Sequence, residues 1–196
     1  MKKIPAMLIW IIIAAAAAIA IYAIVVFNRL VRLRQMANEA WSGIDVQLKR
    51  RSDLVPNLVE AVKGYAAHER STLDEVTALR GAARAMPDAD VEGRAKAESA
   101  LSAGIGRLLA LAEAYPDLKA SGNFLELQKQ LSALEDDLQM ARRYYNGAVR
   151  NLNVEVQAFP SNVIAGVGGF AARDFFELAD AGERNAPQVQ FNPSPS

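Results

Sequence analysis

The fold of this chain can be predicted from residues 40–69, AWSGIDVQLKRRSDLVPNLVEAVKGYAAHE. Apolar residues in this stretch and just before it recur at steps of three and four. They are Leu30, Leu33, Ala37, Ala40 with Trp41, Ile44, Leu48, Val55, Leu58, Val62 and Tyr65. Because an α-helix has 3.6 residues per turn, this spacing places them on one face. The stretch therefore predicts a long helix, from about residue 28 to 64, that forms one wall of a helical bundle.

The same helix can be followed backwards into residues 6–27, an apolar run without a charged side chain. At 1.5 Å per residue the run is about 33 Å long, close to the roughly 30 Å hydrocarbon core of a bilayer. Lys2 and Lys3 before it, and Ala18-Ile19-Ala20 within it, would also fit a cleaved signal peptide. Since the run continues for seven more residues and joins the periodic helix, we predict a retained anchor in contact with the lipid bilayer.

Positive charges flank the apolar run on both sides. Lys2 and Lys3 precede it, and Arg29, Arg32 and Arg34 follow it. The bias over these short flanks is slight and favours a cytoplasmic C-terminal domain. The three arginines are also candidate contacts to lipid headgroups.

Three further helices are predicted, at about residues 72–86, 92–115 and 123–159. Their expected caps are Thr72 with Glu75 or Ser71 with Asp74, then Asp88 or Asp90, then Asn123 with Glu126. Pro56 is expected to kink the first helix, and Pro160 to end the last. The last helix repeats apolar residues over four heptads, which indicates coiled-coil-like packing. Its apolar stripe consists of Phe124, Leu127, Leu131, Leu134, Leu138, Ala141, Tyr145, Ala148 and Leu152.

These elements predict an all-α protein, with a single N-terminal transmembrane helix continuing into an antiparallel up-and-down four-helix bundle. The first and last helices of the bundle are long. The domains are a short N-terminal flank (1–5), the transmembrane helix (6–27), the bundle (28–160), a glycine-rich apolar tail segment (161–181) and a disordered C-terminus (182–196). If the chain returns towards the bilayer at Pro160, the tail lies at the membrane interface; the alternative is that it packs on the flank of the bundle.

The composition argues against most kinds of chemistry. The net charge is zero, cysteine is absent and His68 is the only histidine, which leaves no thiolate site and no pair of Glu-x-x-His motifs for a dinuclear centre. Glu135-Asp136-Asp137 occupies consecutive helical positions that point apart, as expected of a solvated face. No basic stripe of a nucleic-acid binder is present. We therefore predict no enzyme, no cofactor, no metal, no small-molecule substrate and no nucleic-acid partner.

Three long runs of this sequence resemble the LemA family: residues 41–69 (WSGIDVQLKRRSDLVPNLVEAVKGYAAHE), 108–131 (LLALAEAYPDLKASGNFLELQKQL) and 141–166 (ARRYYNGAVRNLNVEVQAFPSNVIAG). Shorter matches are GF at 169–170, FFE at 175–177 and PQVQF from Pro187. The resemblance implies a single-pass bacterial membrane protein with an up-and-down helical bundle and, for some members, a cytoplasmic C-terminal domain. One branch of the family is tied to magnetosome membranes, and genes of the family often lie beside those of membrane proteases or other membrane proteins. The resemblance implies no catalytic residues.

The candidate interaction residues belong to three groups: the basic run of the first helix, two residues of the last helix, and the phenylalanines of the tail. They are Lys49, Arg50, Arg51, Tyr144, Asn146, Phe170, Phe175 and Phe176. The basic run Lys49-Arg50-Arg51 can bind an anionic ligand or lipid, or it can pair with Asp45 and Asp53 on its own helix. Arg51 falls on the apolar stripe, where it either snorkels to solvent or is buried with a partner.

The function predicted from these features is a scaffold or interaction protein of the cell (inner) membrane without catalytic activity. Its protein partner would be a second copy of the chain or another membrane protein. The alternative is an accessory or adaptor subunit of a membrane protease or other membrane complex.

Overall fold

The computed structural model describes residues 6–66 and 68–177, and this part of the chain contains helices and no strand. The helices are α1 (Ala6–Lys63), α2 (Arg70–Ala85), α3 (Val91–Ala112), α4 (Pro116–Lys119), α5 (Gly122–Gln157) and α6 (Ser161–Val167). The predicted all-α class, with a long apolar N-terminal helix followed by further packed helices, is confirmed. The predicted flank at 1–5 and the predicted disordered segment at 182–196 lie outside the described residues.

The chain divides into two compact units. Of the described residues, the first contains 6–54 and 126–176, and the second contains 55–66, 68–125 and 177. Helices α1 and α5 each contribute residues to both units.

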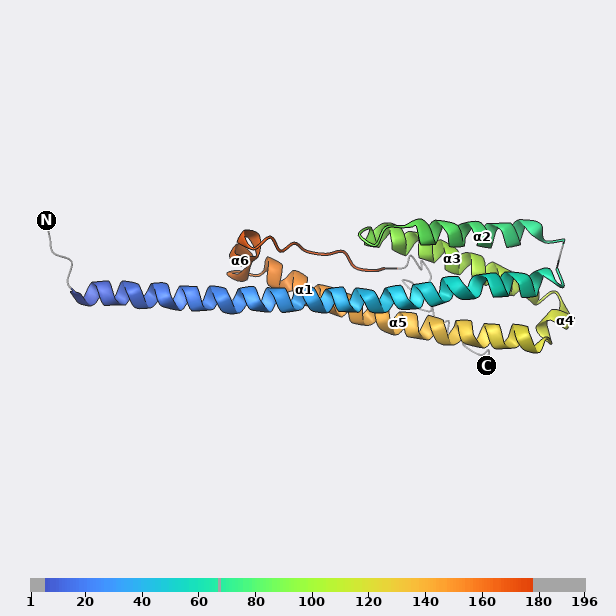
Figure 1. Cartoon of the computed structure of the whole chain (residues 1–196), viewed down its shortest axis with the longest axis horizontal. Helices are drawn as coiled ribbons and strands as arrows, with labels where there is room; N and C mark the ends of the chain where they lie inside the picture. Colours follow the sequence, from blue (N-terminus) through green and yellow to red (C-terminus); the bar gives the residue numbers. More distant parts are fainter. Residues whose placement is uncertain (1–5, 67, 178–196) are drawn as a thin grey trace, which may run out of the picture. The chain divides into compact units, whose positions relative to one another are not determined.

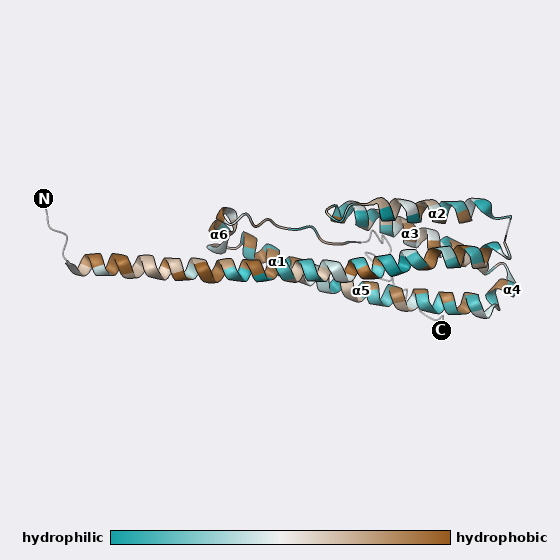
Figure 2. Ribbon diagram, in the orientation of Figure 1, coloured by the Kyte–Doolittle hydropathy of each residue, from teal (hydrophilic) through white to brown (hydrophobic). Residues whose placement is uncertain are grey.

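Helix α1 is a single helix of 58 residues, and it continues through Pro56. The hydropathy of its residues changes along its length, from an apolar first part to a mixed second part (Figure 2). Up to Val25 its large apolar side chains are exposed, for example Trp10 at 70%. From Val26 onwards one face is buried, with Leu30 and Ile44 fully covered. The apolar run and the periodic stripe therefore belong to one uninterrupted element, as their shared pattern predicts.

In the first unit, α1 packs antiparallel to α5. As residue numbers rise along α1 they fall along α5: Arg29 meets Glu155 and Arg51 meets Glu135. The core between them contains the predicted stripe residues Leu131, Leu134, Leu138, Tyr145, Ala148 and Leu152, all buried. The helical phase predicted for α5 is therefore correct.

In the second unit, α2 and α3 form a hairpin that packs closely at Gly104. A Cβ atom at Gly104 would lie 2.8 Å from Leu79 Cδ1, so the absence of a side chain permits this approach. Arg107 of α3 also binds Glu75 of α2, with 2.6 Å between Nη2 and Oε1. At Gly106, in contrast, a Cβ atom would have no neighbouring atom within 4 Å.

The helix ends differ from the predicted caps in two of three cases. Asp90 accepts a hydrogen bond from the Gly93 N–H at 2.8 Å, so the cap of α3 is confirmed. Helix α2 instead follows Glu69 without a side-chain cap, because the chain enters the helix before Ser71 and Thr72. Helix α5 begins at Gly122, which places Asn123 inside its first turn. The short helices α4 and α6 were not predicted.

The contrast between the two α3 glycines gives a stability prediction. Gly106→Ala should raise the free energy of unfolding by about 0.5–1 kcal/mol, because alanine loses less backbone entropy and meets no neighbour here. Gly104→Ala should gain less, since the new methyl group must displace Leu79. Urea unfolding of the two variants, side by side, measures the difference. An equal gain at both sites would contradict the close packing of α2 on α3.

Candidate functional site

The most developed site in the first unit is the surface on which the chain's own tail lies. After α5 the chain turns, forms α6 and then runs back in extended conformation beside α1 and α5 (Figure 1). Gly169 begins this return with φ of 66°, a left-handed conformation that glycine adopts without strain. Over residues 170–176, the predicted apolar tail segment therefore packs on the flank of its own helices.

Two asparagines of α5 hold the backbone of the tail. Asn146 Nδ2 donates to the Phe176 carbonyl (3.2 Å), and its Oδ1 accepts from the Phe176 N–H (2.9 Å). Asn153 makes the same pair of bonds with Arg173, both at 2.9 Å. A side-chain amide carries one acceptor and two donors, so it can satisfy both backbone groups of one residue. The two asparagines thus form the hydrogen bonds that a neighbouring β-strand would otherwise make with an extended segment.

The distance between the two asparagines matches the distance between the two tail residues that they bind. Asn146 and Asn153 are seven residues apart, which is about 10.5 Å along a helix. Arg173 and Phe176 are three residues apart, which is about 10 Å in an extended chain. Since the two distances agree, one face of α5 can bind the tail through both asparagines. These hydrogen bonds use backbone atoms of the tail and do not depend on the identity of its side chains.

An aromatic cluster fixes the end of the tail. The Phe176 side chain is fully buried and packs edge-on against Trp41, with 5.7 Å between ring centroids. Trp41 also contacts Tyr145 at 5.3 Å, and the Tyr145 hydroxyl donates to the Asp174 carbonyl at 3.1 Å. Burial raises the pKa of Tyr145, so this hydroxyl keeps its proton and stays a donor well above neutral pH. The contact it makes should be lost only as pH rises past that pKa.

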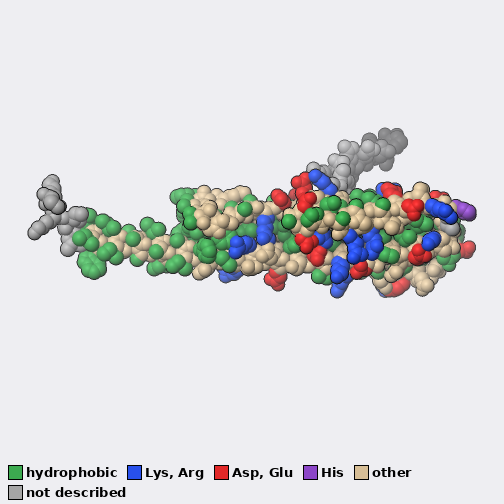
Figure 3. Space-filling view, turned by 45° about the horizontal axis from the view of Figure 1, so that its top comes forward, with side chains coloured by type: hydrophobic (Ala, Val, Ile, Leu, Met, Phe, Trp, Pro, Cys, Tyr) green, Lys and Arg blue, Asp and Glu red, His purple; other side chains and the backbone are tan. Residues whose placement is uncertain are grey.

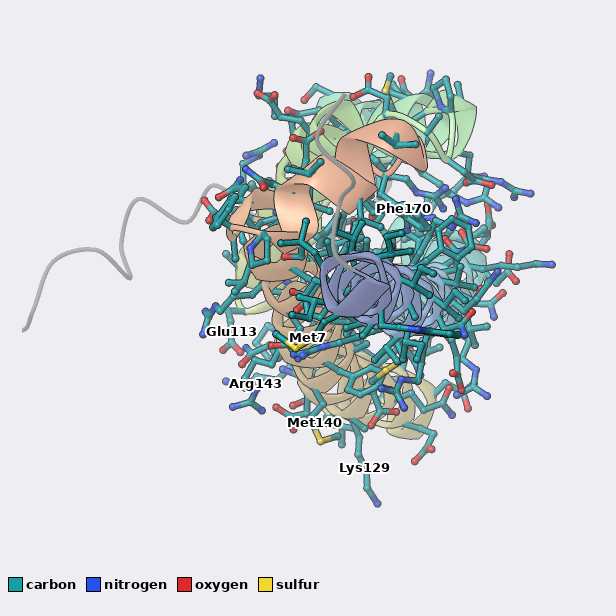
Figure 4. All side chains as sticks on the ribbon, turned by 90° about the vertical axis from the view of Figure 1, so that its left-hand side faces the viewer. Met7, Glu113, Lys129, Met140, Arg143 and Phe170 are labelled. Carbon is teal, nitrogen blue, oxygen red and sulfur yellow. The ribbon has the colours of Figure 1, made fainter. Side chains whose placement is uncertain are left out.

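Phe170 fixes the start of the tail at the end of the apolar run of α1. It is buried and meets Phe27 edge-on, with 5.5 Å between centroids. The Arg34 guanidinium lies 4.8 Å above the same ring, within the range of a cation–π contact. Figure 4, which looks along α1 from its N-terminal end, shows Phe170 beside this helix.

The three arginines that follow the apolar run, Arg29, Arg32 and Arg34, form what we call the arginine collar. Arg29 binds Glu155 at 3.2 Å while its side chain remains 58% exposed. Arg32 is exposed, and Arg34 covers Phe170. Basic side chains accordingly lie next to the apolar part of α1 (Figure 3).

The basic run on α1 is divided between the core and the surface. Arg51 is completely buried and its Nη1 lies 2.8 Å from Glu135 Oε1, so it is a partnered arginine and does not snorkel. Lys49 and Arg50 are exposed. Arg50, Asp53 and Asp137 line a shallow groove of about 390 Å³ with Leu54, Gln130, Ala133 and Leu134. In the predicted solvated face at 135–137, Asp136 is exposed, whereas Glu135 pairs with Arg51 while its side chain stays 36% exposed.

The structure separates the remaining candidates by exposure. Tyr144 is 55% and Phe175 38% exposed, so both are accessible to a partner. Asn146, Phe170 and Phe176 make contacts within the chain. Sequence reasoning missed Trp41 and Asn153 as tail contacts; the seven-residue interval between Asn146 and Asn153 was the available signal. Among residues 6–66 and 68–177, no group of three or more His, Asp or Glu side chains is arranged to hold a metal ion.

These observations define a class of protein: an all-α protein whose N-terminal helix is long and apolar enough to cross a membrane. The chain belongs to the LemA family, whose model matches residues 40–191.

Several bacterial proteins are similar to this chain. Magnetosome protein MamQ 2 of Paramagnetospirillum magneticum is 24% identical over 182 residues, covering 80% of this chain and 66% of the relative. Protein LemA of Metamycoplasma hominis is 29% identical over 138 residues, covering 70% of this chain and 63% of the relative. The chain thus spans about two thirds of the length of these relatives. The similarity and the apolar N-terminal helix are consistent with a bacterial membrane protein.

Proposed function

We propose that this protein is a single-pass scaffold of the bacterial cell (inner) membrane, which presents a helical domain to protein partners and catalyses no reaction. The observation that carries the proposal is the continuity of α1. One helix of 58 residues contains both the apolar run and the buried stripe of the first unit. A partner of that unit would therefore be held close to the bilayer without a flexible linker.

The exposure of the apolar run supports its place in lipid. Between residues 7 and 27 almost every large apolar side chain of α1 is exposed, including Ile19 at 70% and Ile21 at 63%. A helix that is apolar all round would leave a large unfavourable surface in water, and a bilayer removes that surface. The arginine collar supports a cytoplasmic position for the helical domain.

The outer face of α5 supports a protein partner. Met140 and Tyr144 lie one turn apart and are 54% and 55% exposed. Arg143 lies beside them, and Figure 4 shows it and Met140 pointing outwards. Methionine, tyrosine and arginine are enriched where proteins bind one another. We call these three residues the α5 face, and its partner would be a second copy of the chain or another membrane protein.

A second candidate function, as an adaptor subunit of a membrane protease or other membrane complex, is favoured by the way in which α5 binds the tail. Asn146 and Asn153 bind backbone atoms, which every polypeptide offers. The same two side chains would bind an extended segment of a client protein in the same way once the tail leaves them.

Purification of the tagged full-length chain in mild detergent distinguishes the two functions. A scaffold that self-associates should bring down mainly itself, whereas an adaptor should bring down a protease or another membrane protein. Met140→Ala with Tyr144→Ala should reduce the captured partner, and Val154→Ala, at an equally exposed site of α5, should not. Hydrolase activity of the pure protein, abolished by one polar substitution outside the apolar stripes, would refute both functions.

A further inference from the structure

We propose that the turn after α5 and helix α6 form a second membrane contact, in which Phe159, Val163 and Val167 enter the bilayer interface beside α1. This inference rests on the proposed function, because it requires that the apolar run of α1 spans a membrane. We call these three residues the α6 face.

The position of α6 along α1 is the first observation. Phe170, three residues after the end of α6, contacts Phe27 at 5.5 Å, and Glu155 at the end of α5 binds Arg29 at 3.2 Å. Val26 is buried, although the large apolar side chains of α1 before it are exposed. In Figure 2, α6 accordingly lies beside the last part of the brown apolar run. The short helix is therefore level with the place where α1 would leave the hydrocarbon.

The second observation is that large apolar side chains of α6 and of the turn before it are exposed. Phe159 is 83%, Val163 59% and Val167 89% exposed, and the two valines are one turn apart. The buried residues of α6 are the small residues Ser161 and Ala165, and Ile164 is partly buried. The Ser161 hydroxyl lies 2.7 Å from the Glu155 carbonyl, which satisfies its hydrogen bonding internally. An outward apolar surface next to the apolar run is what an interfacial segment presents to lipid.

The charge distribution is the third observation. Residues 156–172 contain no charged side chain, so this segment could enter the interface without desolvating a charge. The arginine collar lies immediately beyond the apolar run, at the level where phosphate headgroups begin. Its positive charges would attract anionic lipids to the same place. Apolar and basic groups are thus ordered along the first unit as lipid tails and headgroups are ordered in a bilayer.

Quenching by nitroxide-labelled lipids tests the contact. Because the chain has no cysteine, an environment-sensitive fluorophore can be attached at one introduced cysteine at a time. We would place it at Val167→Cys, at Ala17→Cys inside the apolar run and at Met140→Cys on α5. The full-length variants are reconstituted in phosphatidylcholine–phosphatidylglycerol vesicles that carry a nitroxide either near the headgroup or deep in the chains. The label at 167 should lose most of its fluorescence to the shallow quencher, that at 17 to the deep quencher, and that at 140 to neither.

A charged substitution provides a matched control. Val163→Asp in the Val167→Cys background should reduce the quenching, because it places a charge on the α6 face. Val154→Asp, at a valine of α5 with nearly the same exposure, should leave the quenching unchanged.

The outcomes separate the inference from the proposed function. Quenching at 17 without quenching at 167 would overturn the α6 contact and leave the membrane anchor in place. If 167 is then also protected from aqueous iodide, a protein and not lipid covers the α6 face. No quenching at 17 would refute the anchor and, with it, the inference.

Discussion

Replacing Leu138 by alanine should lower the free energy of unfolding by about 2–5 kcal/mol, because truncation of a buried leucine loses transfer free energy and leaves a cavity. Leu138 is 1% exposed and lies in the middle of α5, within the core that α5 forms with α1. Few residues near it can move to fill the gap, since both helices are long and regular. Urea unfolding of the detergent-solubilised protein, followed by far-UV circular dichroism, measures the change.

Asp136→Ala is the control for this substitution. Asp136 is two residues away on the same helix and exposed, so its loss should change the free energy of unfolding by less than about 0.5 kcal/mol. Asp137 is a poorer control, because it lines the groove beside Arg50. Equal effects at Leu138 and Asp136 would mean that the face of α5 assigned to the core is wrong.

Replacing Phe176 by alanine should release the end of the tail from the first unit. The fully buried Phe176 ring packs against Trp41, and truncation of a buried phenylalanine removes about 3–5 kcal/mol of stabilisation. Because Phe176 belongs to the tail and contacts Trp41 of α1 and Asn146 of α5, we expect the loss to fall on tail docking and not on the α1–α5 core. Trypsin provides the readout: cleavage after Arg173, whose backbone is held by Asn153, should become much faster.

Two further variants make this result specific. Asn146→Ala leaves the Phe176 N–H and carbonyl without their partner and should also accelerate cleavage, through a loss of about 1–3 kcal/mol. Phe175→Ala alters a neighbouring ring that is 38% exposed and should have little effect. Cleavage at the wild-type rate in both Phe176→Ala and Asn146→Ala would contradict the docked tail.

The parts of this fold that were predictable from sequence are those that repeat. The steps of three and four along α1 and α5 report burial directly, so core positions such as Leu30, Ile44 and Leu138 could be assigned without a structure. The same phase placed Arg51 on the buried face. It could not choose between a snorkelling and a partnered arginine, because the partner, Glu135, is 84 residues away.

The parts that were not predictable depend on contacts distant in sequence. Helices α4 and α6 have four and seven residues, too few for periodicity to be recognised. Asn146 and Asn153 bind backbone groups of the tail, which leave no mark on the tail's side-chain pattern. The missed start of α2 has the same origin, since its first turn is set by the chain entering from Glu69 and not by a local cap.

The proposed scaffold function requires that the membrane anchor and the first helix of the core are one continuous helix. Hydrogen–deuterium exchange of the full-length chain in lipid nanodiscs tests it most directly, because amides in an unbroken helix exchange slowly. We predict slow exchange along α1 without interruption from the apolar run through the arginine collar to Leu48, and slowest within residues 8–25. Fast exchange confined to residues 27–34 would show a flexible linker between the anchor and the domain. Fast exchange throughout residues 8–25 would show that the apolar run is not in the membrane. Either result would contradict the proposed continuous anchor.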